Sequence, residues 1–173
     1  MESNLIDWNR KRAIDTFDTI EKIRGDIEKK AEQIQIKKEK LLKQQKGEGY
    51  QISENIKKEI EDEKKKYIEE QNAHLLAICR KLPMEIRDNG LVTVLAFYMK
   101  KTEEGESQSV GNGIGQAVEA WVKGKFLADK KIDNVLNYMA TCNLQEYQFL
   151  TKEAMEYALW LKRNAEGMIK SVS

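Results

Sequence analysis

Few residues of this chain could carry out acid–base or nucleophilic chemistry. The single histidine, His74, lies in a helical pattern beside two leucines, where a histidine usually has a structural role. The two cysteines, Cys79 and Cys142, lie far apart without ligand-like neighbours, which predicts free thiols, with one disulfide as the alternative. No spacing of Asp and Glu is typical of a metal site, and no Ser, Cys or His arrangement supports a nucleophile. The sequence therefore predicts a protein that is not an enzyme and that holds no cofactor and no metal ion.

A glycine run at Gly111–Gly115, with the sequence GNGIG, is similar to a phosphate-binding loop. The context does not fit such a loop, because no strand signal precedes the run, the third glycine comes one position early and no Gly-Lys-Ser/Thr follows. The run instead predicts a flexible loop that leads into a helix. The N-terminus of that helix could meet an anion.

Basic residues in the second half of the chain occur in small pairs, which could follow a phosphate backbone if several of them converge in space. The pairs are Arg80-Lys81, Lys100-Lys101, Lys123/Lys125, Lys130-Lys131 and Lys162-Arg163. The alternative is that they neutralise the carbonyl ends of helices. That alternative explains Lys100-Lys101 well but Lys162-Arg163 less well, because the last helix is expected to continue past residue 163.

The overall charge limits the kind of nucleic-acid binding that is possible. The 173 residues contain 30 basic and 29 acidic side chains, a net charge of +1, which argues against a polyelectrolyte binder and requires any RNA contact to be a local patch. The longest apolar run is about nine residues, well short of the roughly 20 that span a bilayer, and the first residues carry charges where a signal peptide is apolar. The sequence predicts a soluble, cytoplasmic protein.

The first half of the chain has the pattern of a long helical hairpin. Apolar residues recur every seven positions, with a second column at Phe17 and Ala31. The members of the first column are Ile6, Ala13, Ile20, Ile27, Ile34 and Leu41. The polar segment 43–49 predicts the turn, and Ser53 the N-cap of the second helix. Folding about residue 48 leaves a charged arm, about 26–66, that projects roughly 30 Å. The arm is either a solvated coiled-coil hairpin or a contact surface for a neighbouring subunit.

The second half of the chain predicts shorter helices. The most apolar run, Leu91–Met99, is expected to be a helix covered on most sides, since no other segment could pair with it as a strand. Pro83 predicts the first turn of a short preceding helix, which ends at Asn89-Gly90. The polar segment 102–109 predicts a loop.

Three amphipathic stripes follow that loop. They comprise Val110, Ile114, Ala117/Val118 and Trp121/Val122, then Ile132, Val135/Leu136 and Met139, and finally Ala154, Ala158, Leu161, Ala165 and Met168. The last helix is predicted to begin after Thr151 as its N-cap. Its residues Leu159, Trp160 and Arg163 lie off the apolar face, where they either pack peripherally or contact another subunit.

The predicted fold is therefore all-α, a helical bundle of about six helices with a long protruding antiparallel helical hairpin near the N-terminus. We expect one domain over residues 1–173. Its core comprises about 5–25 and 67–170, and the polar hairpin arm comprises about 26–66.

Two stretches of the sequence carry a family resemblance. Their patterns are LP..I..NGL....AF, from Leu82 to Phe97 and followed by Lys100-Lys101, and Y..LT.EA.....WLKR.A, from Tyr147 to Ala165. Together they resemble the small α-helical subunit of the type III-B CRISPR (Cmr) RNA-targeting effector complex, and Arg12-Ala13 looks like the opening helix of that family. The resemblance covers roughly residues 10–23 and 67–170. Asn164 stands where the family commonly has an aromatic residue, and the arm is longer than the usual family hairpin.

The resemblance implies a non-catalytic subunit of an antiviral ribonucleoprotein. Copies of such a subunit form a minor filament beside the backbone subunits that hold the guide RNA, and they help to bind the target RNA, while other subunits cleave it. The implied partners are the backbone and large subunits, further copies of this chain, and the guide and target RNA, with no membrane and no small-molecule substrate. By motif match the RNA-facing residues are Lys162 and Arg163, followed by Lys100 and Lys101. Two alternatives are a helical adaptor without a nucleic-acid role and the small subunit of a type III-A complex.

Overall fold

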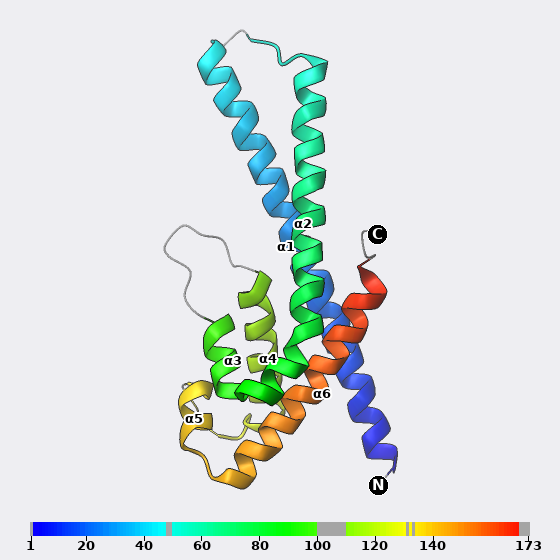
Figure 1. Cartoon of the computed structure of the whole chain (residues 1–173), viewed down its shortest axis with the longest axis vertical. Helices are drawn as coiled ribbons and strands as arrows, with labels where there is room; N and C mark the ends of the chain where they lie inside the picture. The colour runs from blue at the N-terminus through cyan, green and yellow to red at the C-terminus, as the bar shows by residue number, and fades with distance from the viewer. Residues whose placement is uncertain (1, 48–49, 100–109, 131, 133, 170–173) are drawn as a thin grey trace.

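The computed structural model describes residues 2–47, 50–99, 110–130, 132 and 134–169. These residues form helices and no strand, which confirms the predicted all-α class (Figure 1). The helices are α1 (Glu2–Lys46), α2 (Glu54–Asn89), α3 (Leu91–Tyr98), α4 (Val110–Phe126), α5 (Val135–Thr141) and α6 (Leu144–Met168).

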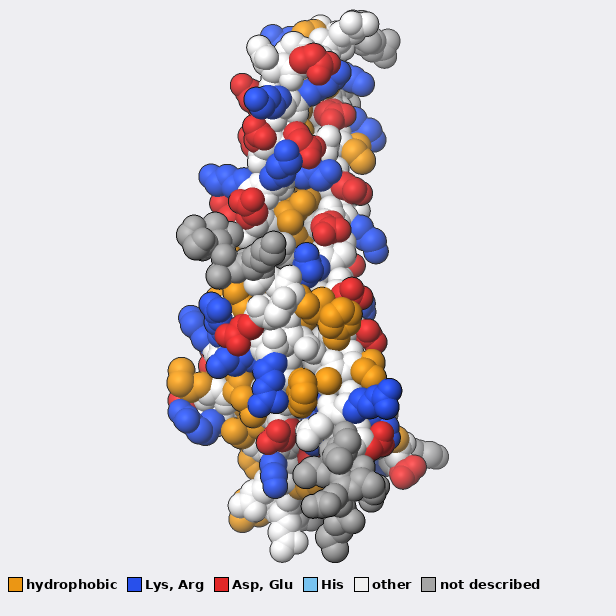
Figure 2. All heavy atoms as spheres, turned by 90° about the vertical axis from the view of Figure 1, so that its right-hand side faces the viewer, with side chains coloured by type: hydrophobic (Ala, Val, Ile, Leu, Met, Phe, Trp, Pro, Cys, Tyr) orange, Lys and Arg blue, Asp and Glu red, His pale blue; other side chains and the backbone are white. Residues whose placement is uncertain are grey.

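Helices α1 and α2 form the predicted antiparallel hairpin. Figure 1 shows their distal halves projecting beyond the other helices and diverging toward the tip. Figure 2 shows acidic and basic side chains alternating over this arm, with hydrophobic side chains more frequent on the lower half of the molecule. The link between the helices lies later than the predicted 43–49, because α1 continues through Lys46 and α2 begins only at Glu54. Ser53 occupies the N-cap position as predicted, although its side chain makes no capping hydrogen bond among the described residues.

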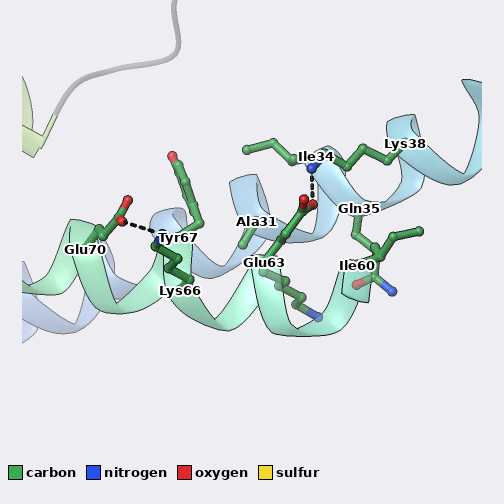
Figure 3. Close-up of a pocket in the computed structure, with 10 residues that line it drawn as sticks. Ala31, Ile34, Gln35, Lys38, Ile60, Glu63, Lys66, Tyr67 and Glu70 are labelled. Atoms are coloured by element: carbon green, nitrogen blue, oxygen red, sulfur yellow. Dashed lines mark hydrogen bonds and ion pairs between the residues drawn. The ribbon is translucent and has the colours of Figure 1, made fainter. Parts of the chain in front are cut away.

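The buried stripe of α1 differs from the predicted heptad. Ile20, Ile23, Ile27 and Ala31 are buried at spacings of three and four, whereas Phe17 and the distal members Ile34 and Leu41 are exposed. A straight helix drifts about 20° per heptad, so a strict seven-residue column leaves the packed face unless the helices supercoil. The register across the hairpin is also shifted, since Lys38 pairs with Glu63 (Figure 3) and not with the neighbourhood of residue 58.

Pro83 lies inside α2 and does not begin a separate helix, so that prediction is wrong. The proline has no N–H to donate to the carbonyl of Cys79, and Figure 1 shows α2 turning near its lower end. Gly90 ends the helix as predicted, with φ of +81° and its N–H donating to the carbonyl of Ile86 at 3.0 Å. A Cβ atom at Gly90 would lie 3.1 Å from the Tyr147 hydroxyl, so the turn and the packing both favour glycine.

The apolar segment after Gly90 is a helix, α3, as predicted. It packs against α2, α4 and α5, with Leu91, Val94 and Leu95 buried. The expectation that this helix is covered on most sides is wrong, because Phe97 is 73% exposed and Ala96 is also exposed. The central element of the bundle is α6, which packs against α1, α2 and α4.

The glycine run Gly111–Gly115 forms the first turns of α4 and is not a loop. A Cβ atom on Gly111 would lie 2.9 Å from the Tyr98 ring, and one on Gly115 would lie 3.0 Å from Tyr98 Cβ and from Met99 Cγ. The glycines are therefore the small residues that allow α4 to approach α3 closely. The predicted polar loop 102–109 lies outside the described residues.

Helix α6 begins eight residues earlier than predicted. Asn143 is its N-cap, and the Asn143 side chain accepts a hydrogen bond of 2.9 Å from the Glu146 backbone N–H, so Thr151 lies within the helix. The predicted apolar face is confirmed at Ala154, Ala158, Leu161 and Ala165, and Leu150 and Tyr157 extend it. The earlier start gives α6 enough length to cross both α1 and α2.

The close approach of α3 and α4 can be tested at two glycines of the same helix. We expect Gly115→Ala to lower the free energy of unfolding by about 1 kcal/mol or more, because overpacking of about 1–3 kcal/mol exceeds the gain in helix propensity. Gly124→Ala is the matched control, since a Cβ atom there meets nothing within 4 Å. It should stabilise the protein by about 0.5–1 kcal/mol in urea denaturation. Equal effects of the two substitutions would contradict the packing role.

Candidate nucleic-acid interface

A buried ion pair fixes α6 against α1. Arg12 Nη2 donates to Glu153 Oε2 at 2.5 Å, and the two side chains are only 5% and 14% exposed. Arg12 Nη1 also donates to the Asn9 side chain at 3.1 Å. A buried charge that loses its partner is costly, so this contact allows little freedom in how the two helices cross.

Two further residues of α6 continue this seam with polar contacts toward the end of the helix. The Tyr157 hydroxyl donates to Asp15 Oδ2 at 2.6 Å, and burial together with this hydrogen bond raises the pKa of Tyr157 above its usual value. Asn164 Nδ2 donates to the Ala13 carbonyl at 2.9 Å and to Thr16 Oγ1 at 2.7 Å. These two contacts satisfy the side-chain amide of Asn164, at the position where the resemblance implies an aromatic residue.

An aromatic stack closes the other side of the same crossing. The rings of Trp121 and Tyr157 are stacked with centroids 4.9 Å apart, and Trp8 meets Trp121 edge to face at 6.2 Å. Phe126 stacks on Trp8 at 5.6 Å. Helices α1, α4 and α6 thus share one aromatic cluster, which fixes the rotation of α6 and hence the side chains on its outer face.

The predicted RNA-facing residues Lys162 and Arg163 lie on α6, beyond this seam. Arg163 is exposed, and its guanidinium lies 5.0 Å from the ring centroid of Trp160. Lys162 is half-buried. Neither side chain forms an ion pair with any residue that the structure describes, so both cations stay available to an external anion.

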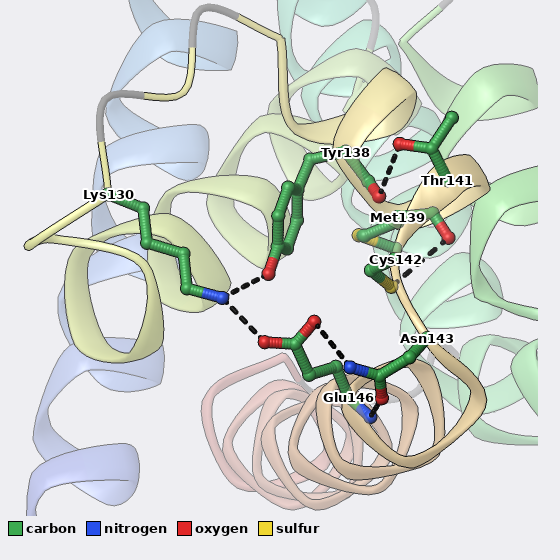
Figure 4. A network of polar contacts seen from close by, with 7 residues as sticks. All are labelled: Lys130, Tyr138, Met139, Thr141, Cys142, Asn143 and Glu146. Carbon is green, nitrogen blue, oxygen red and sulfur yellow. Dashed lines mark hydrogen bonds and ion pairs between the residues drawn. The ribbon is translucent and has the colours of Figure 1, made fainter.

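Other predicted basic pairs are partly neutralised within the protein. Arg80 pairs with Glu166 at 3.0 Å. Lys130 pairs with Glu146 at 2.5 Å and also donates to the Tyr138 hydroxyl (Figure 4). The Lys130 contact lowers the pKa of the Glu146 carboxyl and raises the pKa of Lys130 itself. Lys100, Lys101 and Lys131 lie outside the described residues.

A shallow groove of about 280 Å³ runs along the outer face of α6. It is lined by Tyr147, Gln148, Thr151, Lys152, Met155, Glu156 and Leu159. Lys162 follows Leu159 by three positions and Met155 by seven, so helical geometry places it on the same side of α6 as the groove. The sequence predicted that Leu159 lies off the apolar face of the last helix, and in the structure Leu159 lines this surface groove. Lys162 lies next to it and extends the groove along α6.

The sequence did not predict the buried Arg12–Glu153 pair. The signal was present, because Arg12 and Thr16 continue the stripe of Ile20, Ile23 and Ile27 at helical spacing. A charged residue in such a stripe is normally interpreted as an interruption, since the partner that neutralises it lies 141 positions away.

The part of the chain that the structure describes bears on both metal binding and membrane spanning. No group of three or more His, Cys, Asp or Glu side chains there could hold a metal ion, and His74 is exposed. Both cysteines are free thiols. None of the described helices combines the length and the apolar character that a membrane span requires.

The described residues form an all-helical chain with a projecting arm, and its central helix presents two cations without an ion pair on its outer face. Such features are typical of a subunit that binds other macromolecules in an assembly. A family model described as CRISPR-associated protein (Cas_Cmr5) matches residues 48–168, and the chain belongs to this family. It is a small subunit associated with type III CRISPR complexes, and the predicted resemblance to the type III-B small subunit is confirmed. The family implies that its partners are other subunits of the Cmr complex.

The matched residues begin in the link before α2, so α1 lies outside the match. No curated protein matches the chain, and no solved structure matches it.

The buried pair between α1 and α6 gives a stability prediction. Arg12→Met leaves the Glu153 carboxylate buried without its partner and should lower the free energy of unfolding by about 3–5 kcal/mol. Arg12→Met/Glu153→Leu should recover much of that loss, because no buried charge remains. Urea denaturation followed by circular dichroism measures both. The control Lys11→Met removes an exposed cation that pairs with Asp7 and lies 5.3 Å from the ring centroid of Trp8, and it should cost no more than about 1–2 kcal/mol. A similarly small effect of Arg12→Met would contradict the role of the pair.

The two thiols should differ in reactivity. Burial raises the pKa of Cys79 to about 12, whereas Cys142 is partly exposed. Iodoacetamide at pH 8 should therefore label Cys142 in the native protein and Cys79 only in urea, as read by peptide mass spectrometry. The contribution of the Cys79 thiol to stability is complete below pH 9 and is lost as the pH rises toward 12, because the unfolded thiol ionises first. Equal native labelling of both cysteines would contradict this prediction.

Proposed function

We propose that this chain is a non-catalytic small subunit of a type III-B CRISPR effector complex that helps to hold the target RNA along the guide RNA. Membership of the family supports the assignment to the complex. The observation that carries the RNA role is the presence of Lys162 and Arg163 on the outer face of α6 without a carboxylate partner among the described residues. In this proposal the chain acts in the cytoplasm, as one domain over residues 1–173, and other subunits perform the cleavage.

Lys162 and Arg163 have the charge and the surface position that contacts with an RNA phosphate backbone require. The near-neutral net charge means that binding depends on local side chains and not on the overall field of the protein. Arg163 is held over Trp160, which reduces the side-chain freedom that a phosphate contact would have to remove. Lys162 lies at the end of the α6 groove, so the two cations can contact successive phosphates. Lys100 and Lys101 are proposed as additional contacts on the motif match alone.

Copies of the chain are proposed to line up as a minor filament beside the backbone subunits. A filament positions the outer face of α6 repeatedly along an extended RNA, so weak contacts of each copy add up. The isolated chain should accordingly bind RNA only weakly and in a salt-sensitive manner.

A helical adaptor without an RNA role is the second candidate. The projecting arm favours it, since a long polar hairpin is well suited to contact another protein. The two candidates differ in what co-purifies with the native chain. The first requires a set of CRISPR-derived guide RNAs, and the second requires a protein partner without RNA.

The RNA role can be tested in the assembled, guide-loaded complex. Lys162→Ala/Arg163→Ala should weaken target-RNA retention and reduce the magnitude of the logarithmic salt slope by about 1–2, because two phosphate contacts are lost. Filter binding over a series of salt concentrations measures both quantities.

The matched control for this experiment is Lys57→Ala/Lys58→Ala, which removes the same charge from the distal part of the arm. It should leave target-RNA retention unchanged. Retention that is equal in the wild type and in the α6 variant would refute the proposed site.

A further inference from the structure

Trp160 differs in its surroundings from the other two tryptophans of the chain. Trp121 is 3% exposed and belongs to the hydrophobic core, and Trp8 packs against that core. Trp160 is half-buried on α6, and it neither belongs to the core nor packs against it. In the part of the chain that the structure describes, no aromatic ring contacts Trp160, whereas Trp8 and Trp121 contact each other. Core packing therefore does not explain why α6 carries a tryptophan at this position.

The polar edge of the Trp160 ring is accessible to water. The indole N–H of Trp121 is buried without a hydrogen-bond partner. The indole N–H of Trp160 is not buried in this way, and no described residue accepts a hydrogen bond from it. The protein thus covers part of the Trp160 ring, which fixes its position, and leaves another part available to a ligand.

Two cations lie beside the ring. The guanidinium of Arg163 is 5.0 Å from the ring centroid of Trp160, and a guanidinium is smaller than an indole, so it covers only part of one ring face. Helical geometry places Arg163 between Trp160 and Lys162 around the circumference of α6. A strand of RNA that crosses α6 at this level would therefore meet the ring, the guanidinium and the ammonium group in that order.

The carboxylates of α6 limit where a phosphate can lie. Glu153 and Glu166 are each paired with an arginine. Glu156 lies one turn before Trp160, and it forms no ion pair with any residue that the structure describes. Phosphates are therefore favoured on the side of the two cations, and the part of a nucleotide that suits Trp160 is the uncharged base.

We propose that Trp160 is a stacking platform for an unpaired base of the RNA, and that Arg163 and Lys162 contact the phosphates that flank this base. The inference rests on the proposed RNA role of α6 and adds a base contact to that site. Bases stack on aromatic rings and on guanidinium planes, so Arg163 extends the platform. Every base has such a face, and the contact therefore requires an unpaired nucleotide and not a particular sequence.

A contact with a neighbouring subunit is the alternative for Trp160. An apolar protein surface placed on the ring would also cover the adjacent Arg163, and a cation removed from water without a partner is costly. A nucleotide supplies both a flat apolar face and an anion. The chemistry beside the ring therefore favours the nucleotide.

The test compares two ligands of equal length that bind to the full-length chain in low salt, namely oligoadenylate and the same ribose–phosphate chain without bases. Fluorescence anisotropy of the labelled ligands gives both dissociation constants. We expect the wild type to prefer oligoadenylate by about fivefold or more, which is typical of one stacked base. Trp160→Leu should lose most of this preference and still bind the abasic chain. Equal affinity of the wild type for the two ligands would overturn the inference.

Tryptophan emission gives a second readout, which does not depend on the folding of the leucine variant. Oligoadenylate should quench the emission of the wild type, and the abasic chain should not. Trp160→Phe keeps an aromatic platform, so it should still prefer oligoadenylate but should lose the quenching, because Trp8 and Trp121 lie in the aromatic cluster. Quenching that persists unchanged in Trp160→Phe would show that the base lies elsewhere and would refute the assignment.

Phe149→Leu is the matched control, because Phe149 is 49% exposed on the same helix and no described cation lies over its ring. It should keep the preference of the wild type, and a loss equal to that of Trp160→Leu would contradict the role of Trp160. Lys162→Ala should weaken the binding of both ligands alike and leave the preference unchanged.

The same measurements separate this inference from the proposed RNA role on which it rests. If the wild type binds neither ligand, or if Lys162→Ala/Arg163→Ala changes the affinity for neither, the RNA role fails and the base contact fails with it. If that double variant weakens the binding of both ligands but the wild type shows no preference for oligoadenylate, the RNA role stands and only the base contact is refuted.

Discussion

The crossing of α1 and α6 is the constraint on which the rest of this structure depends. A buried arginine and glutamate meet there, and a charge taken out of water must keep its partner in one geometry. The hydroxyl of Tyr157 and the amide of Asn164 reinforce that geometry along the helix. Because the inner face of α6 is fixed in this way, its outer face is fixed as well, and the cations that define the proposed RNA contact lie on that outer face.

The packing of α3 against α4 depends on close steric fit and not on charge. Glycines in the first turns of α4 allow its backbone to approach the end of α3, and the tyrosine and methionine there fill the space that side chains on α4 would occupy. The glycine run Gly111–Gly115, which is similar in sequence to a phosphate-binding loop, therefore serves the packing of α4 against α3. The same helix contributes Trp121 to the aromatic cluster beneath α6, so the two halves of the core meet through one element.

The arm buries a smaller share of its apolar side chains than the core does. Near the bundle its limbs share buried residues such as Ala31 and Ile60, but toward the tip they diverge and the apolar column of α1 is left partly exposed. Isolated polar helices gain little from propensity alone, so such an arm gains stability when another helical surface covers it.

The sequence by itself determined the fold class, the hairpin, the buried faces of α4 and α6 and the family, because these follow from local periodicity and from short motifs. It did not determine where helices begin and end when tertiary contacts override a local signal: Pro83 is accommodated within α2, and α6 starts at Asn143 and not at Thr151. Only the tertiary structure decided that Arg12 is buried with a carboxylate 141 positions away and that Phe17 and Phe97 face outward. The physical reason is that burial is a property of the partner surface, and periodicity along one helix shows only which residues share a face.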